Sequence, residues 1–194
     1  VDSYVCARFR PNAYLSGQFS ARKTGQQHAF MVYGNLSHDG GYKDDSGFEQ
    51  QKLNVIHQFQ DAQFNIKSVF SVTNLNQETA GFINGENAYQ NKSIKRNNPN
   101  PEAFRDNKSV KAYSEISYNI DDTSNVSITP YLRYTDMAFL QHFLPWKSLE
   151  ENSQKGLGIK SQYEKEYQSL TWLIGLDVDL TQGELIESQA EDFS

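Results

Sequence analysis

Apolar and polar residues alternate along the segment SLTWLIGLDVDLT, residues 169–181. The positions that alternate with the apolar residues include two carboxylates, Asp177 and Asp179. Because successive side chains of a β-strand point to opposite faces, the pattern predicts a strand with one apolar and one polar face. The apolar members are Leu170, Trp172, Ile174, Leu176, Val178 and Leu180.

The same alternation predicts seven further strands, and helical spacing is nowhere sustained. These strands are expected at residues 13–21, 28–37, 52–59, 64–74, 112–120, 126–136 and 157–163. Short connections at 22–27, 60–63, 121–125 and 164–168 alternate with long polar ones at 38–51, 75–111 and 137–156. The sequence therefore predicts an all-β, antiparallel up-and-down meander of about eight strands, with short connections at one end and long ones at the other.

This alternation of connection lengths is typical of an outer-membrane β-barrel, which has brief periplasmic turns and long extracellular loops. Aromatic residues on the apolar parity near the short connections fit a girdle at one membrane interface. They are Phe59, Phe64, Tyr118, Tyr163 and Trp172. Aromatic residues also favour strands in general, and an antiparallel sandwich shows the same alternation, so the pattern alone leaves a sandwich open.

Composition narrows the function classes. The 194 residues carry a net charge of -6, which argues against nucleic acid as a partner. The single cysteine, Cys6, excludes an intrachain disulfide. The sequence contains no nucleophile elbow, zinc-ligand spacing or phosphate-binding glycine loop, so we expect neither an enzyme nor a bound cofactor or metal.

Several stretches resemble the barrel of TonB-dependent outer-membrane receptors, in particular the iron-complex (siderophore) receptors. They are NLSHDGGYKDDSGFEQQKLN (35–54), NLNQETAGFINGENAY (74–89), NPNPEAFRD (98–106), TPYLRYTDMAFLQHFLP (129–145) and LEEN (149–152). The resemblance implies a 22-stranded barrel in the bacterial outer membrane, plugged by an N-terminal domain, that imports scarce ligands such as ferric siderophores. It also implies that import is driven by the inner-membrane TonB complex.

The resemblance covers the barrel only, because neither a plug domain nor a TonB box is found in the sequence. We therefore expect residues 1–194 to be an excerpt of the transmembrane barrel wall, in contact with outer-membrane lipid and an iron chelate, and to reach TonB through parts not present here. An excerpt has two unpaired sheet edges, which hydrocarbon does not tolerate, so residues 1–194 alone should not transport a ligand.

Two of the long connections contain candidate ligand contacts. Arg96 and Arg105 in 75–111 present cations to an anionic chelate, although acidic neighbours make a solvated lid the simpler interpretation. In 137–156, Phe139, His142 and Trp146 belong to an apolar cluster that either packs inside the barrel mouth or contacts the ligand.

Charges on the polar parity include Glu115, Arg133, Asp177 and Asp179. A charge on the lipid face costs roughly 2–4 kcal/mol for Lys or Arg at the midplane, so these residues are expected to face a hydrated lumen. The two aspartates should lie towards the extracellular mouth and pair with lumen arginines or loop residues. Two alternatives stay open: a soluble all-β carbohydrate- or ligand-binding module, and a complete small eight-stranded outer-membrane barrel.

Overall fold

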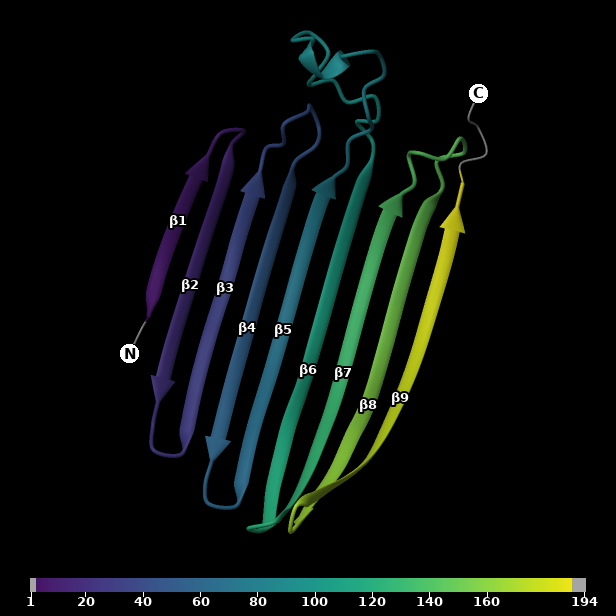
Figure 1. Ribbon diagram of the computed structural model, residues 1–194. Helices are drawn as coiled ribbons and strands as arrows, with labels where there is room; N and C mark the ends of the chain where they lie inside the picture. Colours follow the sequence, from purple (N-terminus) through teal and green to yellow (C-terminus); the bar gives the residue numbers. More distant parts are fainter. Residues whose placement is uncertain (1–2, 190–194) are drawn as a thin grey trace.

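The computed structural model describes residues 3–189 as a single antiparallel sheet (Figure 1). Its strands follow one another in chain order, so every neighbouring pair is a meander hairpin. The strands are β1 (Tyr4–Arg10), β2 (Tyr14–Thr24), β3 (His28–Asp39), β4 (Phe48–Gln60), β5 (Phe64–Glu78), β6 (Phe104–Asp121), β7 (Ser124–Leu140), β8 (Leu149–Tyr167) and β9 (Leu170–Ser188). A short 3-10 turn, Ala88–Gln90, lies in the connection between β5 and β6.

The predicted all-β meander is confirmed, with nine strands in place of eight. The added strand is β1, which pairs with β2 along its whole length. The predicted bounds of the long connections are wrong, because the strands extend into them. The connections between described strands span 40–47, 79–103 and 141–148, and β8 and β9 reach 19 residues each.

The sheet is open, with β1 and β9 at its two edges (Figure 1). A sandwich needs a second sheet, and a closed small barrel needs its first and last strands to pair. Neither feature is present in residues 3–189, so both alternative architectures are excluded for the described chain. No helix in the same residues is long and apolar enough to cross a membrane.

The strand register separates two faces, which we call the apolar face and the polar face. One row of the apolar face runs across seven strands through directly paired residues. The row consists of Val32, Val55, Phe70, Ala112, Leu132, Leu157 and Leu180. The polar face carries Lys67, Glu115, Tyr131, Arg133, Lys160, Asp177 and Asp179.

Almost nothing covers the apolar face. In residues 3–189 the buried hydrophobic side chains are Ala88 and Ala103, both in the connection between β5 and β6. Large side chains of the apolar face stay exposed, with Trp172 at 57% and Leu176 at 66%. Ordinary monomeric soluble proteins rarely expose an apolar surface of this extent, so the face requires an apolar environment.

Aromatic rings line the apolar face at the end with short connections. Phe64 on β5 and Tyr118 on β6 are directly paired, with ring centroids 4.8 Å apart. On β3 and β4, the ring of Phe30 stacks on His57 at 4.4 Å, and Phe59 lies 4.9 Å from His28. Of the five residues in the predicted aromatic row, Phe64 and Tyr118 contact each other, and Phe59 contacts His28 in a second group of rings with Phe30 and His57.

Candidate functional site

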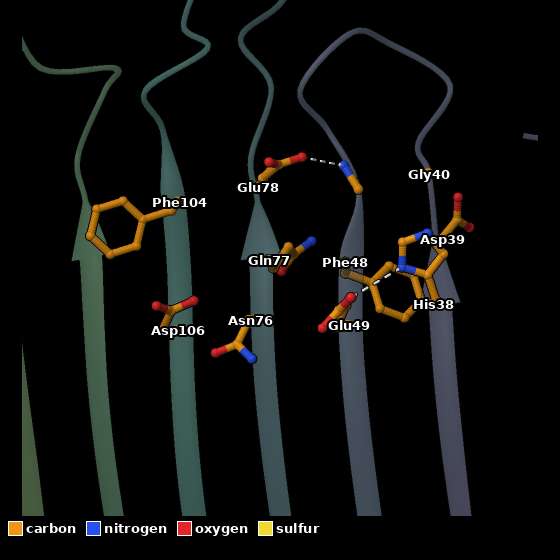
Figure 2. A pocket seen from close by; sticks show the side chains of 11 residues that line it. His38, Asp39, Gly40, Phe48, Glu49, Asn76, Gln77, Glu78, Phe104 and Asp106 are labelled. Atoms are coloured by element: carbon orange, nitrogen blue, oxygen red, sulfur yellow. Dashed lines mark hydrogen bonds and ion pairs between the residues drawn. The ribbon is translucent and has the colours of Figure 1, made fainter. Parts of the chain in front are cut away.

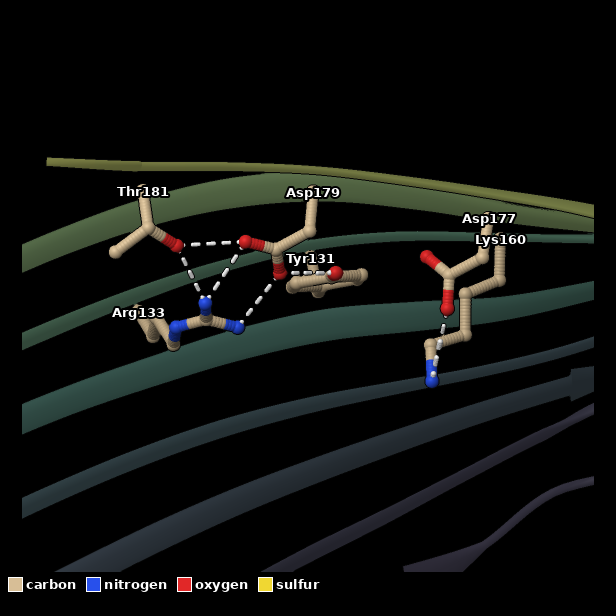
Figure 3. Close-up of polar contacts among 6 residues, drawn as sticks. All are labelled: Tyr131, Arg133, Lys160, Asp177, Asp179 and Thr181. Carbon is tan, nitrogen blue, oxygen red and sulfur yellow. Dashed lines mark hydrogen bonds and ion pairs between the residues drawn. The ribbon is translucent and has the colours of Figure 1, made fainter.

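A polar network joins β7 and β9 on the polar face (Figure 3). Both terminal nitrogens of Arg133 donate to Asp179, at 2.8 Å from Nη1 to Oδ2 and 2.9 Å from Nη2 to Oδ1. The Tyr131 hydroxyl donates to Oδ2 of the same carboxylate, and the Thr181 hydroxyl donates to its Oδ1 at 2.6 Å. Asp179 is thus held by three side chains from two strands, and its bidentate contact with a guanidinium fixes the geometry.

Two glycines of β8, the strand between β7 and β9, allow the side chains of β7 to reach β9. On β8, Gly158 lies between Tyr131 and Asp179, and Gly156 lies between Arg133 and Thr181. A Cβ atom at Gly156 would lie 2.8 Å from Nε of Arg133, and one at Gly158 would overlap the Tyr131 ring. The two missing side chains let Tyr131 and Arg133 lie across β8 and touch β9.

The other predicted charges of this face are also paired. Nζ of Lys160 lies 3.6 Å from Oδ2 of Asp177, and Nζ of Lys67 lies 3.6 Å from Oε2 of Glu115. A hollow of about 1050 Å³ adjoins these groups, lined in part by Lys111, Tyr113, Tyr131, Arg133 and Asp177. The polar face therefore combines a network of mutually neutralising charges with room for a hydrated ligand or another part of the protein.

The position expected for the aspartates is wrong. Pairing with β8 continues to Ser188, well beyond Thr181, so Asp177 and Asp179 lie at the middle of β9 and not near its loop end. Sequence reasoning found Arg133 and Asp179 but missed Tyr131 and Thr181 as their partners. The Gly-Leu-Gly spacing at 156–158 is the signal that could have indicated the cross-strand reach.

At the loop end, four of the apolar and cationic side chains form a continuous cluster, which we call the rim cluster. It consists of Arg105, Phe139, His142 and Phe143. The guanidinium of Arg105 lies 4.4 Å from the centroid of the Phe139 ring, a cation–π distance. Phe143 contacts both Phe139, at 6.0 Å between centroids, and His142, at 5.7 Å.

Two members of the rim cluster were expected in loops, but Arg105 lies in β6 and Phe139 in β7. They are directly paired across the two strands, and this register fixes the contact between guanidinium and ring. His142 belongs to the connection, and its buried Nδ1 makes no hydrogen bond within residues 3–189. A buried ring nitrogen without a partner is costly, and this one is closed to solvent, so the exposed part of the cluster is the part that a ligand can reach.

The remaining two candidates lie elsewhere. Arg96 and Lys95 approach the ring of Tyr42, each at 5.9 Å from its centroid. Trp146 is 46% exposed at the loop end. Of the five predicted ligand contacts, three thus belong to the rim cluster, Arg96 belongs to a second cationic site around Tyr42, and Trp146 is half-exposed at the loop end.

The three long connections are tied to one another. The Asp44 amide donates to the Arg96 carbonyl at 2.8 Å, and the Asn98 side chain donates to the Asp45 carbonyl at 2.7 Å, which joins 40–47 to 79–103. Nζ of Lys147 donates to Glu102, which joins 141–148 to 79–103, and this hydrogen bond lowers the pKa of the Glu102 carboxyl. The loops therefore form one connected layer above the strands.

A smaller hollow of about 300 Å³ lies where β3 to β6 meet these connections (Figure 2). Its lining is rich in carboxylates, with Glu49, Glu78 and Asp106 among them. Oε1 of Glu49 lies 3.4 Å from Nδ1 of His38, and Oε2 of Glu78 accepts from the Gly47 amide at 3.2 Å. An acidic lining does not suit an anionic chelate, so the cationic rim cluster is the better candidate for ligand contact.

In residues 3–189, no group of three or more His, Cys, Asp or Glu side chains is arranged to hold a metal ion.

The described residues form a single open meander with one apolar and one polar face, which is the architecture of a stretch of β-barrel wall. Among solved structures, the chain is similar to the ferric citrate transporter FecA in its unliganded form, with a TM-score of 0.75 and 9% identity over 98% of this chain. It is also similar to the ferric-catecholate import receptor Fiu of E. coli K12 in its closed form, with a TM-score of 0.70 and 10% identity over 92% of this chain.

The chain spans 30% of the FecA chain and 31% of the Fiu chain. At such low identity the likeness establishes the fold, an all-β sheet matching part of large outer-membrane barrels. The sequence matches no protein-family model and no curated protein.

Proposed function

We propose that this chain is part of the barrel wall of a bacterial outer-membrane receptor for TonB-dependent uptake of an iron complex, with a ferric siderophore as the leading ligand class. The observation that carries the proposal is the division of one open sheet into a lipid-compatible face and a charged, hydrated face. The similarity to two iron-complex receptors supports it. Contact with the TonB complex is assigned to parts of the receptor outside residues 1–194.

The dimensions of the apolar face support a membrane span. Apolar residues on this face of β9 run from Leu170 to Leu180. At about 3.4 Å per residue and a tilt of roughly 40°, this stretch covers about 26 Å of thickness, close to the apolar band of about 25 Å in outer-membrane barrels. Beyond it the same face becomes polar, in a paired row through Lys108, Asp136, Ser153 and Glu184. The loop ends of β6 to β9 therefore project from the membrane as a hydrated wall.

We infer the orientation of the sheet in the membrane from its two ends. The aromatic row beside the short connections marks the periplasmic interface, because brief turns lie on that side of outer-membrane barrels. The connected layer of long loops then lies outside the cell, where it meets the ligand. The rim cluster lies at the boundary between this layer and the polar face, on the path from the outside into the barrel.

We assign ligand contact to the rim cluster and Trp146. Arg105 supplies a cation, Phe139 and Phe143 supply aromatic surface, and His142 supplies a further ring packed against Phe143. Such a combination suits an anionic iron chelate with an apolar or aromatic scaffold. The ligand is the cargo of the receptor, and no resident metal or cofactor is implied.

The test is binding and uptake by the full-length protein, with ferric citrate and a ferric catecholate as probes. The triple variant Phe139→Ala, His142→Ala, Trp146→Ala should bind the transported complex about tenfold or more weakly. Phe82→Ala is the matched control, because Phe82 is a 76% exposed aromatic of the same loop layer outside the rim cluster. Unchanged affinity in the triple variant would remove the ligand role from these residues, and absence of iron uptake by the wild-type protein would overturn the proposed function.

A further inference from the structure

A hollow of about 570 Å³ interrupts the apolar face at the middle of the sheet. Apolar side chains from β4, β5, β7 and β8 surround it, including Val55, Phe70, Leu132 and Leu157. Its floor is made of small or compact residues, Ser68, Ala112, Ser114 and Pro130. A lipid-facing strand surface with bulky neighbours and a small-residue floor offers a place for one hydrocarbon chain.

Pro130 explains part of the floor. A proline has no N–H to give to the neighbouring strand, so it weakens the ladder where it lies. The pairing of β6 with β7 passes from Tyr113–Tyr131 to Ile116–Ile128, and the residues between are not paired across these two strands, although Pro130 is still paired with Ile159 of β8. The Ser68 and Ser114 hydroxyls beside it are 2.7 Å apart and hydrogen-bond to each other, which satisfies these polar groups within the apolar surroundings.

One end of the hollow is His57, which forms a pair with His28 of β3. Nδ1 of His28 and Nε2 of His57 are 3.0 Å apart, the rings are inclined by only 14°, and their centroids are 5.3 Å apart. The centroid separation is close to the N···N distance plus two ring radii, so the imidazoles lie nearly in one plane and share one N–H···N bond. This bond leaves Nε2 of His28 and Nδ1 of His57 available to a ligand, and the one that carries a proton can donate it.

In the proposed orientation, the imidazole pair lies at the membrane interface on the short-connection side. His28 is paired directly with Phe59 of the aromatic row, and Lys23 of β2 is paired with Phe30 beside it. The one remaining imidazole N–H of the pair and the ammonium group of Lys23 are complementary to the oxygens of a phosphate diester. Charge complementarity thus indicates an anionic headgroup at this end of the hollow.

The strand register indicates the direction of the hydrocarbon chain. At β4, His57 lies one step of two residues from the aromatic Phe59. At β8, Leu157 at the far end of the hollow lies three such steps from the aromatic Tyr163. The hollow therefore rises from the interface into the apolar band as it crosses from β4 to β8, as an acyl chain does below its headgroup.

We propose that the apolar face holds one glycerophospholipid of the short-connection leaflet, with its phosphate at His28, His57 and Lys23 and one acyl chain in the hollow over Ser114. The site rests on the proposed function, because it needs the apolar face to meet a bilayer. It adds a specific lipid site to a surface otherwise expected to contact bulk lipid only.

The test is lipid retention by the full-length protein purified in detergent with added phosphatidylglycerol, counted by native mass spectrometry. We expect one retained phosphatidylglycerol in the wild type, and about tenfold less occupancy in the double variant His28→Gln, His57→Gln and in Ser114→Phe, which fills the hollow. His38→Gln and Ala138→Phe are matched controls, because they change the same face of β3 and β7 at the loop end. Both controls should retain the lipid as the wild type does.

No retained phosphatidylglycerol in the wild type, retention of lipid A in its place, or unchanged occupancy in the histidine double variant would each overturn the proposal. Loss with the histidine variant but not with a folded Ser114→Phe protein would overturn the acyl-chain assignment. Iron-complex uptake by the same variants separates the two claims. Uptake should persist in the histidine double variant and in Ser114→Phe, so the lipid site can fail while the receptor function stands. A wild-type protein that neither inserts into a membrane nor binds an iron complex would overturn the receptor function itself.

Discussion

The two faces of the sheet satisfy their side chains in different ways. On the polar face, charged groups are matched within the protein, as Arg133 is to Asp179 and Lys160 is to Asp177. On the apolar face, side chains such as Leu176 and Trp172 remain more than half exposed. The polar face is therefore largely complete in itself, whereas the apolar face is complete only against a surrounding apolar medium.

The largest expected effect on stability comes from placing a charge on the apolar face. Leu176→Arg puts a guanidinium at the centre of the apolar stretch of β9, whereas Gln162→Arg puts the same group on the polar face of β8, opposite Gly175. We expect Leu176→Arg to destabilise the membrane-inserted full-length protein by roughly 2–4 kcal/mol, since an arginine near the bilayer midplane loses its hydration. Gln162→Arg should change stability by less than about 0.5 kcal/mol, as for other hydrated surface positions.

Reversible unfolding by denaturant from lipid bilayers measures both values. Equal destabilisation by the two variants would mean that the faces do not differ in their surroundings. A larger cost for Gln162→Arg would reverse the assignment of lipid and lumen.

A smaller effect is expected from the glycines that allow contacts across the polar face. Gly158→Ala would drive a Cβ atom into the Tyr131 ring, and we expect a loss of roughly 1–3 kcal/mol, typical of overpacking. Gly17 lies in β2 on the apolar face, and a Cβ atom there meets nothing within 4 Å. Gly17→Ala should therefore be neutral or stabilising by up to about 1 kcal/mol, because it reduces the freedom of the unfolded chain.

The unfolding free energy of the full-length protein compares the two alanine variants. Chemical shifts or fluorescence of Tyr131 would show whether its ring has left Asp179 in Gly158→Ala. An equal response of both glycine variants would contradict the view that the polar face depends on close cross-strand contact.

The difference between the faces also explains how much of the fold the sequence predicts. The apolar band has a period of two in hydropathy, and there the predicted strands and their two faces agree with the structure. Beyond the band, segments such as FRDNKSV and LEENSQK are polar on both faces, so alternation disappears while backbone pairing continues. The sequence therefore predicts strands that are too short at the loop end: β6 and β8 begin before residues 112 and 157, β7 continues beyond residue 136, and Arg105 and Phe139 lie in strands where loops are predicted.

Contacts across three strands could not be predicted from periodicity. Parity places Tyr131, Arg133 and Asp179 on one face, but only the register aligns them with Gly158 and Gly156. Register depends on how each hairpin closes, and a shift of one residue would move every side chain to the opposite face. The rim cluster has the same origin, because its cation–π contact follows from the direct pairing of Arg105 with Phe139.

The smallest expected effect concerns an ion pair in the loop layer and depends on pH. Glu102 binds Lys147, and this contact lowers the pKa of the Glu102 carboxyl below its ordinary value. Because the folded-state pKa is lowered, the contact contributes fully above the ordinary glutamate pKa and is lost as the pH falls through the lowered value. Both side chains are more than a third exposed, at 42% for Glu102 and 35% for Lys147, so salt also weakens the contact.

Acidification should therefore speed hydrogen exchange of the 141–148 amides in the wild type, after correction for the intrinsic pH dependence of exchange. Glu102→Gln should show the faster exchange already at neutral pH. Protection that is the same in Glu102→Gln and wild type at every pH would show that the connection is held by its strands alone.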